Sequence, residues 1–235
     1  MNADVPAADI LVVDGLTKRF GTAGPPVIDN LSFVIPRGGR VALFAPTGSG
    51  KSTLINILTG LERADSGSFT VAARRPATVF QEPRLLPHMT VEENILLPIR
   101  MRRTPLSPAL LARYADWLAM CDLTAYTQHY PYQLSGGMKQ KVALIRGFLT
   151  EPDFVMLDEP FKSLDGRAKQ QIITHILATY PGISLLFVTH TIEEIPLLAQ
   201  SLLRFREGRL ASYTLHDAAR IDTTLMEAFY AKSES

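Results

Sequence analysis

A glycine-rich stretch near position 50 has the residue types and spacing that bind phosphate. It consists of Ala45, Pro46, Thr47, Gly48, Ser49, Gly50, Lys51, Ser52 and Thr53. Glycines allow successive backbone N–H groups to turn toward one anion, and a helix that starts here adds the positive end of its dipole. Lys51 is placed to reach the β- and γ-phosphates of a nucleotide, and the Ser52 hydroxyl is placed to bind Mg²⁺. We therefore predict a nucleotide-phosphate site; the alternative is a glycine-rich turn without a ligand.

The residues on both sides of this stretch fit a phosphate-binding loop. The apolar run 41–44 precedes it and the helical pattern 54–58 follows it. Strand, loop and helix in this order form the context that such a loop requires. Ala45 departs from the motif because it stands where the first glycine is expected. Its Cβ is tolerable only if that residue keeps φ below zero.

Two adjacent carboxylates follow a second apolar run. Asp158 ends the run 154–157, and Glu159 comes directly after it. An aspartate at the end of a buried strand suits Mg²⁺, usually through water. A glutamate beside it is placed to polarise an attacking water. The alternative is a pair of strand-end carboxylates facing solvent, and the phosphate loop upstream favours the site.

Gln81 and His190 also stand at the ends of apolar runs. Ligands collect at the carboxyl ends of strands in α/β sheets. A glutamine there can contact Mg²⁺ or the water, and a histidine can contact a γ-phosphate. Taken singly, each residue could equally be an ordinary polar residue at a strand end.

Residues 134–140 form a second device that could bind an anion. Ser135 is a natural N-cap, Gly136 and Gly137 permit close backbone approach, and a helix from Met138 offers its positive end. The alternative is a capped helix without a ligand. A chain with two phosphate-binding helix starts needs either two ligands or two chains that share them.

A mixed α/β framework must position these residues. The patterns predict strands at 10–13, 31–35, 40–44, 67–71, 78–80, 154–157, 183–188, 201–205 and 209–213, the last two as a hairpin. They predict helices at 54–58, 90–97, 107–121, 137–150, 167–179 and 223–231. Thr90 with Glu93 fits a capping box, and Ser107 before Pro108 fits a helix start. Strands that alternate with helices indicate a parallel sheet with crossover helices.

Composition limits the function classes. The chain has 235 residues, 46% of them apolar, and a net charge of +1, so no nucleic-acid partner is expected. The single cysteine, Cys121, excludes an internal disulfide and a cysteine metal cage, and it is expected to be a small core residue. The N-terminus lacks the pattern of a signal peptide, and no apolar stretch is long enough to span a bilayer. We expect a soluble, cytoplasmic protein whose membrane part, if it needs one, is another chain.

Taken together, the motifs resemble the ATP-binding subunit of ABC transporters. They are Gly50–Thr53, Leu134–Gly137, Val155–Pro160, Thr189–His190 and the D-loop match Ser163–Asp165, in that family's order over nearly the whole chain. The resemblance implies the ABC ATPase fold: an α/β P-loop NTPase core with a mixed sheet, an N-terminal antiparallel β portion and an inserted helical subdomain. It implies a single domain over 1–235, with 1–80 and 151–235 as the core and 81–150 as the Q-loop and helical subdomain.

The same resemblance implies a role for each site residue. Glu159 is the catalytic base, His190 the switch histidine, Gln81 the Q-loop glutamine, and Phe20 the ring that stacks on adenine. The signature residues Ser135, Gly136 and Gly137 bind the γ-phosphate held by an opposite subunit.

The family also implies the partners. These are ATP with Mg²⁺, a second copy of the chain, a membrane permease and, indirectly, a solute-binding protein, at the inner face of the membrane. The segment 81–97 is where a permease is expected to dock, on the exposed-looking apolar residues Leu85, Leu86, Pro87 and Met89.

A finer resemblance points to importer subunits for nitrate, taurine and alkanesulfonates, on residues 80–87, 94–95 and 189–194. The sequence itself does not identify the cargo, and no additional C-terminal regulatory domain is expected. One competing hypothesis is a soluble ABC ATPase of DNA repair or the ribosome, which usually has two cassettes or a long coiled-coil insertion. Another is a regulatory module that does not hydrolyse nucleotide; intact Lys51, Asp158, Glu159 and His190 argue against it.

Overall fold

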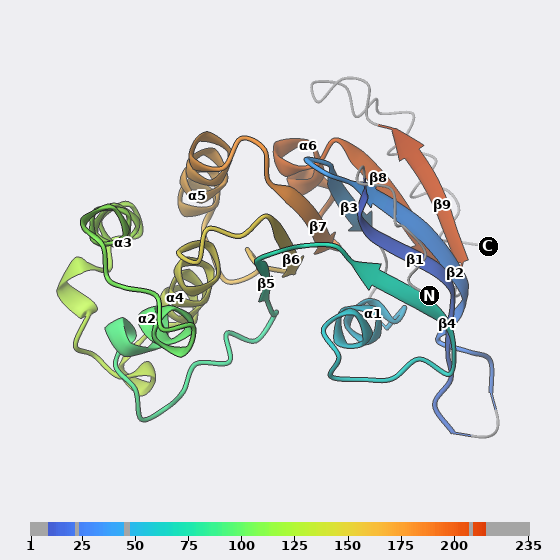
Figure 1. Cartoon of the computed structure of the whole chain (residues 1–235), viewed down its shortest axis with the longest axis horizontal. Helices are drawn as coiled ribbons and strands as arrows, with labels where there is room; N and C mark the ends of the chain where they lie inside the picture. The colour runs from blue at the N-terminus through green and yellow to red at the C-terminus, as the bar shows by residue number, and fades with distance from the viewer. Residues whose placement is uncertain (1–8, 22–23, 45–47, 207–208, 215–235) are drawn as a thin grey trace.

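The structure is a computed structural model that describes residues 9–21, 24–44, 48–206 and 209–214. Ala45, Pro46 and Thr47 and the predicted helix 223–231 lie outside the described residues. One sheet is antiparallel, in the order β2-β1-β4. Its strands are β1 (Asp9–Lys18), β2 (Ile28–Pro36) and β4 (Ser66–Val71) (Figure 1). This is the N-terminal antiparallel portion that the sequence predicted.

The second sheet has the order β5-β6-β7-β3-β8-β9. Its strands are β3 (Arg40–Phe44), β5 (Pro76–Val79), β6 (Phe154–Asp158), β7 (Ser184–Thr189), β8 (Ser201–Arg206) and β9 (Arg209–Thr214). The first five in that order run parallel, and β9 pairs antiparallel with β8 in the predicted hairpin. Every residue of β6 and β7 is buried, as expected for apolar strands covered on both faces.

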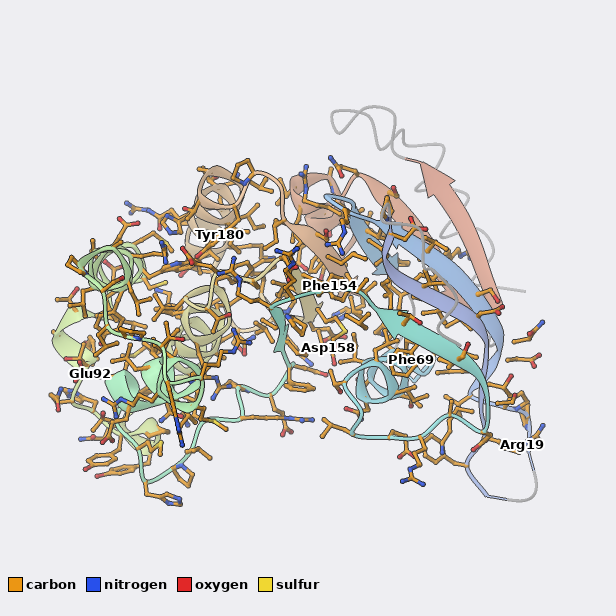
Figure 2. All side chains as sticks on the ribbon, viewed as in Figure 1. Arg19, Phe69, Glu92, Phe154, Asp158 and Tyr180 are labelled. Atoms are coloured by element: carbon orange, nitrogen blue, oxygen red, sulfur yellow. The ribbon has the colours of Figure 1, made fainter. Side chains whose placement is uncertain are left out.

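The two faces of this sheet belong to different hydrophobic clusters. Phe154 and Met156 of β6 pack with α1 (Lys51–Leu58) and the antiparallel sheet. Val155 and Leu157, which alternate with them, pack on the other face with the remaining long helices. These are α2 (Val91–Met101), α3 (Pro108–Met120), α4 (Gly136–Phe148) and α5 (Gly166–Thr179). Figure 2 shows Phe154 and Asp158 in the interior, whereas Arg19 lies at the periphery.

Local helix signals are confirmed. The Thr90 hydroxyl accepts from the Glu93 amide at 3.2 Å, and the Glu93 carboxylate accepts from the Thr90 amide at 2.8 Å. The Ser107 hydroxyl accepts from the Leu110 amide at 3.2 Å, with Pro108 at the first helical position. A short helix, α6 (Ile195–Leu198), and three 3₁₀ turns at 124–126, 131–133 and 192–194 were not predicted.

Strand β1 and helix α2 continue well beyond the residues that the patterns indicated. Strand β1 continues to Lys18 instead of ending at Val13, because a register shift around Gly15, at φ 61°, interrupts its alternation without ending the pairing. Helix α2 continues through Pro98 to Met101, since burial of Ile99 in the core offsets the cost of a proline in the helix.

Cys121 is buried at the C-terminal cap of α3. Burial raises the pKa of its thiol to about 12, which keeps the thiol protonated and unreactive. The prediction of a small core residue is confirmed. Among the residues that the structure covers, no helix combines the length and the apolar character needed to cross a membrane.

Candidate nucleotide site

The glycine-rich loop leaves the carboxyl end of β3 and enters α1 in a conformation that requires glycine. Gly48 has φ 83° and Gly50 has φ 95°, both in the left-handed region where a Cβ is unfavourable. Gly50 is the N-cap of α1, and its carbonyl accepts the Leu54 amide at 3.0 Å. The free amides of the first turn of α1 therefore face the loop, which is the arrangement that binds phosphate.

Strand register brings the other predicted residues to the same edge. Phe44, which ends β3, pairs with Thr189 of β7. Val188 in turn pairs with Asp158 at the end of β6. The segments that follow these three strands therefore begin side by side, although the segment after β3 lies far from the other two in sequence.

A cavity of about 450 Å³ opens at this edge. It is lined by Phe20, Val27, Gly48, Gly50, Lys51, Ser52, Thr53, Gln81, Glu159, Lys162 and His190. All but two of these residues, Val27 and Lys162, were predicted from the sequence. The volume lies in the range of small-molecule sites. The predicted signature residues Ser135, Gly136 and Gly137 do not line it.

Glu159 lies at the centre of the charged groups. One carboxylate oxygen, Oε1, is 2.9 Å from His190 Nδ1 and 3.9 Å from Lys51 Nζ. The other, Oε2, is 3.7 Å from Lys162 Nζ. Sequence reasoning missed Lys162, whose only signal was its position three residues after Glu159. A carboxylate that is 9% exposed and surrounded by three nitrogen groups is suited to accept a proton from water.

The backbone of Glu159 is itself unusual. Its φ is 43°, in the left-handed region that a glutamate rarely adopts. Its amide donates to the Val188 carbonyl of β7 at 2.9 Å, which fixes this conformation. Held in this way, the side chain leaves the strand end toward the cavity. Strain of this kind is concentrated at functional sites.

Asp158 supplies a carboxylate oxygen that suits a metal ion. The residue is 4% exposed, and its Oδ1 has no hydrogen-bond partner among the described residues. Burial and the neighbouring charge of Glu159 raise the pKa of Asp158, against a hydrogen bond from the Ser52 hydroxyl. Mg²⁺ prefers oxygen ligands and would satisfy this buried oxygen. Ser52 and Asp158 therefore fit the predicted Mg²⁺, with Gln81 exposed at the cavity rim.

Lys51 is a buried cation, 6% exposed, at the start of α1. Burial lowers the pKa of its ammonium group, while the Glu159 and Asp158 carboxylates act in the opposite direction. A buried ammonium group beside a helix start is favourable when an anion is bound there. This position is compatible with the predicted contact of Lys51 with a nucleotide phosphate.

The raised pKa of Asp158 predicts an unusual effect on stability. The folded protein holds this proton more tightly than the unfolded chain, so ionisation lowers stability as the pH rises from the ordinary value of 3.8. Without nucleotide and Mg²⁺, we expect Asp158→Asn to raise the free energy of unfolding at pH 7 by about 1 kcal/mol. The gain should shrink as the pH is lowered toward 3.8. Urea unfolding at about pH 7 and at about pH 4.5 measures this difference in stability.

Asp153 provides the matched control with the opposite sign. Burial opposes its ionisation, but hydrogen bonds from the Arg74 and Arg75 amides hold the pKa of Asp153 below its ordinary value. The ionised carboxylate therefore stabilises the fold at pH values above 3.8, and this stabilisation is lost as the pH falls through the lower pKa of the folded protein. Asp153→Asn should lower stability at pH 7. A loss of stability in both variants would contradict a raised pKa for Asp158.

The signature residues start α4 at a different place. The Ser135 hydroxyl accepts from the Met138 amide at 3.2 Å, which confirms the predicted N-cap. A Cβ on Gly137 would come within 2.8 Å of the Ser163 carbonyl oxygen, so this glycine allows α4 to pack on the segment after Glu159. Ser135 and Gly136 are exposed. The start of α4, which was predicted to bind an anion, thus faces outward and is separate from the cavity that holds Lys51.

Phe20 lies at the edge of the nucleotide cavity with 55% of its surface exposed. The Lys18 ammonium is 5.1 Å from the centre of its ring. Exposed aromatic faces bind bases by stacking, with little discrimination between them. The predicted adenine contact is therefore available, and Val27 adds an apolar contact that the sequence did not single out.

The segment after Gln81 is held by a half-buried arginine and a buried asparagine. The Arg146 guanidinium donates to the Pro83 and Arg84 carbonyls at 2.7 and 3.0 Å. Asn94, fully buried, accepts the Leu86 amide at 2.8 Å and donates to the Leu86 carbonyl at 3.1 Å. Sequence reasoning assigned no role to Arg146 or Asn94. Together they fix the shape of the loop that begins at the nucleotide cavity.

Only two of the four apolar residues that were expected to be exposed on this loop are exposed. Leu86 is 37% exposed, and Pro87 is exposed beside it. Leu85 and Met89 are half-buried, and Leu85 packs against the main hydrophobic cluster. The expectation of exposure was therefore wrong for Leu85, which packs on the core, and for Met89, which is half-buried.

Comparison with known proteins agrees with this geometry. A protein-family profile described as ABC transporter matches residues 28–162. An aliphatic sulfonates import ATP-binding protein from Nocardia farcinica is 38% identical over 210 residues, which cover 88% of this chain and 82% of the relative. A sulfate/thiosulfate import ATP-binding protein from Bacillus cereus is 34% identical over 213 residues, covering 84% of this chain but only 59% of the relative.

Solved structures give the same result. One is described as an ATP-binding subunit of an ABC transporter; it has a TM-score of 0.82 and 28% identity, over 96% of this chain and all of that one. Another is a dimeric ATP-binding cassette in a post-hydrolysis state with ADP and phosphate; it has a TM-score of 0.78 and 26% identity, over 88% of this chain and 99% of that one. The predicted fold class is confirmed. From the profile match and the length of these alignments, the chain belongs to the family of ABC transporter ATP-binding proteins.

Proposed function

We propose that this chain binds and hydrolyses ATP and powers the import of a small solute through a separate membrane permease. The observation that carries the proposal is the convergence of Glu159, His190 and Lys51 around one cavity, with Ser52 hydrogen-bonded to Asp158 behind it. Phosphoryl transfer depends mainly on positioning and on neutralising phosphate charge, and these residue types supply both.

Each residue has a distinct part in the reaction. The loop amides and Lys51 hold the β- and γ-phosphates. Ser52, Asp158 and Gln81 would hold Mg²⁺, which would neutralise phosphate charge when bound. Glu159 accepts a proton from the attacking water, and His190 beside it contacts the γ-phosphate and orients the carboxylate.

We further propose that the working unit is a homodimer with two shared ATP sites. Ser135, Gly136 and Gly137 do not line the cavity of their own chain. In a two-fold dimer the same residues of a second copy can close the cavity over the γ-phosphate. A dimeric cassette among the similar structures supports this arrangement. Hydrolysis removes the bridging phosphate and lets the dimer open, which is a motion that a permease can use.

The similar proteins support a small oxyanion as cargo, in the nitrate, sulfonate or taurine class. One relative is named for aliphatic sulfonates and another for sulfate and thiosulfate. The chain would act at the inner face of the membrane, with a solute-binding protein as an indirect partner. Within one ABC ATPase domain, 81–150 would move as the helical subdomain against the core formed by 1–80 and 151–235.

Leu86 offers a direct test of the permease partner. The loop that presents it is fixed by Asn94 and Arg146, so an aspartate there changes the surface more than the fold. Isolated from solubilised membranes, the wild-type chain should co-purify with a multi-spanning protein and support sulfonate uptake in vesicles. Leu86→Asp should lose both while keeping ATP hydrolysis. Leu61→Asp, at a leucine that is 59% exposed elsewhere, should lose neither.

An active ATPase found only in the soluble fraction, with no membrane partner for the wild type, would instead favour the soluble ABC ATPase. Normal uptake by Leu86→Asp would exclude this loop as the dock.

A further inference from the structure

A second cavity, of about 440 Å³, shares no lining residue with the nucleotide cavity. It lies between the end of α2, the start of α3, the end of α4 and the residues that precede β5. Part of its floor is apolar and buried, formed by Ile99, Leu110 and Leu149. The cavity is therefore nearly as large as the nucleotide site and has an apolar base.

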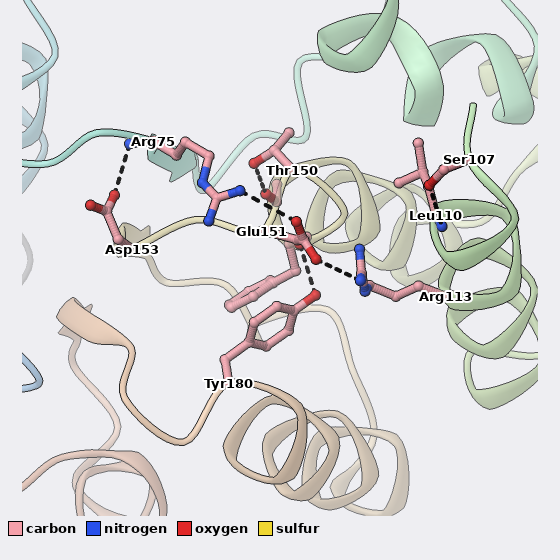
Figure 3. A network of polar contacts seen from close by, with 10 residues as sticks. Arg75, Ser107, Leu110, Arg113, Thr150, Glu151, Asp153 and Tyr180 are labelled. Carbon is pink, nitrogen blue, oxygen red and sulfur yellow. Dashed lines mark hydrogen bonds and ion pairs between the residues drawn. The ribbon is translucent and has the colours of Figure 1, made fainter. Parts of the chain in front are cut away.

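The charged groups around this cavity are mostly arginines. Glu151 is the single carboxylate in the lining, and it faces two guanidinium groups. Its Oε2 is 3.3 Å from Arg75 Nη1, and its Oε1 is 2.5 Å from Arg113 Nη2. Figure 3 shows Arg75 and Arg113 reaching this carboxylate from two sides. One negative charge is thus shared between two positive charges.

Two further arginines, Arg74 and Arg102, also line the cavity and are exposed. Within the part of the chain that the structure describes, neither guanidinium has an ion pair or hydrogen bond. Four guanidinium groups around one carboxylate leave a large positive excess over an apolar floor. Like charges held together in this way repel one another unless an anion joins them.

The backbone on one side of the cavity is fixed in place. The Asp153 carboxylate accepts the Arg74 and Arg75 amides, each at 2.8 Å, and does not itself line the cavity. On the other side, Ser107 caps α3 through the Leu110 amide. The arginine-bearing segments are therefore held before any ligand arrives, which lowers the cost of binding one.

We propose that this cavity binds a small organic anion with an oxyanion head group and a short apolar tail. Arg74 and Arg102 take the head group, because a guanidinium fork matches the oxygens of a sulfonate, phosphate or carboxylate. The tail lies on Ile99, Leu110 and Leu149. The Glu151 bridge holds Arg75 and Arg113 as the wall of the site. Binding here uses none of the residues that line the nucleotide cavity, since the two cavities have no residue in common.

The test is calorimetric titration of the full chain with hexane-1-sulfonate. We expect saturable binding, weaker binding of methanesulfonate, which lacks the tail, and no binding of hexan-1-ol, which lacks the charge. Arg102→Glu should weaken binding about tenfold or more. Arg103→Glu is the matched control, because Arg103 is the adjacent exposed arginine and does not line the cavity. Both variants should bind an ATP analogue as the wild type does. If the sulfonate does not bind, the proposed ATPase function is therefore unaffected.

Vesicles distinguish a free anion from a lipid head group. Flotation with phosphatidylcholine vesicles, with and without phosphatidic acid, is measured for the wild type and for Arg102→Glu. Binding that needs phosphatidic acid, is competed by hexane-1-sulfonate and is lost in Arg102→Glu identifies a lipid as the source. Binding of the soluble probe alone identifies a free anion. Absence of saturable binding to either probe, or an equal loss in Arg103→Glu, overturns the proposal.

Discussion

Replacing Glu159 with glutamine is expected to lower ATP turnover at least about 100-fold while leaving ATP affinity nearly unchanged. The glutamine keeps the size of the side chain but cannot accept the proton of the attacking water. The surrounding groups, His190 at 2.9 Å and Lys51 at 3.9 Å, remain in place to hold the nucleotide. Mg²⁺-dependent phosphate release and equilibrium binding of an ATP analogue measure the two effects separately.

Glu193→Gln is the control for this substitution. Glu193 is an exposed glutamate that follows the neighbouring strand, β7, and does not line the cavity, so its replacement should leave turnover unchanged. Turnover of Glu159→Gln at the wild-type rate would show that another group is the base.

The same variant tests the proposed dimer. With the base removed, ATP should hold two chains together, because its γ-phosphate persists. Size-exclusion chromatography of Glu159→Gln should give a dimer with ATP and a monomer with ADP or without nucleotide. A monomer in all three conditions, for the isolated chain and again for the chain assembled with its permease, contradicts an ATP-bridged dimer.

Mixing two inactive variants is expected to restore ATP hydrolysis. Lys51→Ala damages the phosphate loop, and Ser135→Arg blocks the start of α4. If each site combines the loop of one chain with the α4 start of the other, both single variants are inactive as homodimers. A mixed dimer carries both defects in one site and leaves its second site intact. Random mixing with independent sites should give about one quarter of wild-type turnover.

The double variant carrying both substitutions in one chain is the matched control. Mixed with the wild type, it forms heterodimers in which each site has one defect, so these heterodimers should be inactive. Sites formed within single chains require the opposite pattern: no recovery from the two single variants, and retained activity in the heterodimers of the control. The two assembly schemes therefore predict opposite activities for each mixture, and steady-state phosphate release decides between them.

Much of the nucleotide site followed from local sequence because its chemistry depends on local backbone geometry. Gly48 and Gly50 adopt left-handed φ values that few other residues tolerate, so their spacing is visible in the sequence. Asp158 and His190 were recognisable for a related reason, because each ends or follows an apolar run whose burial makes it a strand. Helix starts at Thr90 and Ser107 were likewise encoded within three residues.

Groups that act across long separations in sequence were not predictable in this way. His190 and Lys51 contact Glu159 only because β3, β6 and β7 align in register. Arg146 holds the loop at Pro83 over a separation of 63 residues. None of these contacts leaves a periodic pattern or a short motif, since the partners are placed by packing of whole elements.

The sequence by itself determined the family, the phosphate-binding loop, the paired strand-end carboxylates and the outline of the mixed sheet. Each is encoded by near neighbours, through backbone conformation, capping or alternation of burial. The tertiary structure alone decided that Leu85 turns inward, that Ser135 stands apart from the cavity of Lys51, and that four arginines surround a second cavity around Glu151. These features depend on which distant segments meet, and that is set by the packing of two hydrophobic clusters on opposite faces of one sheet.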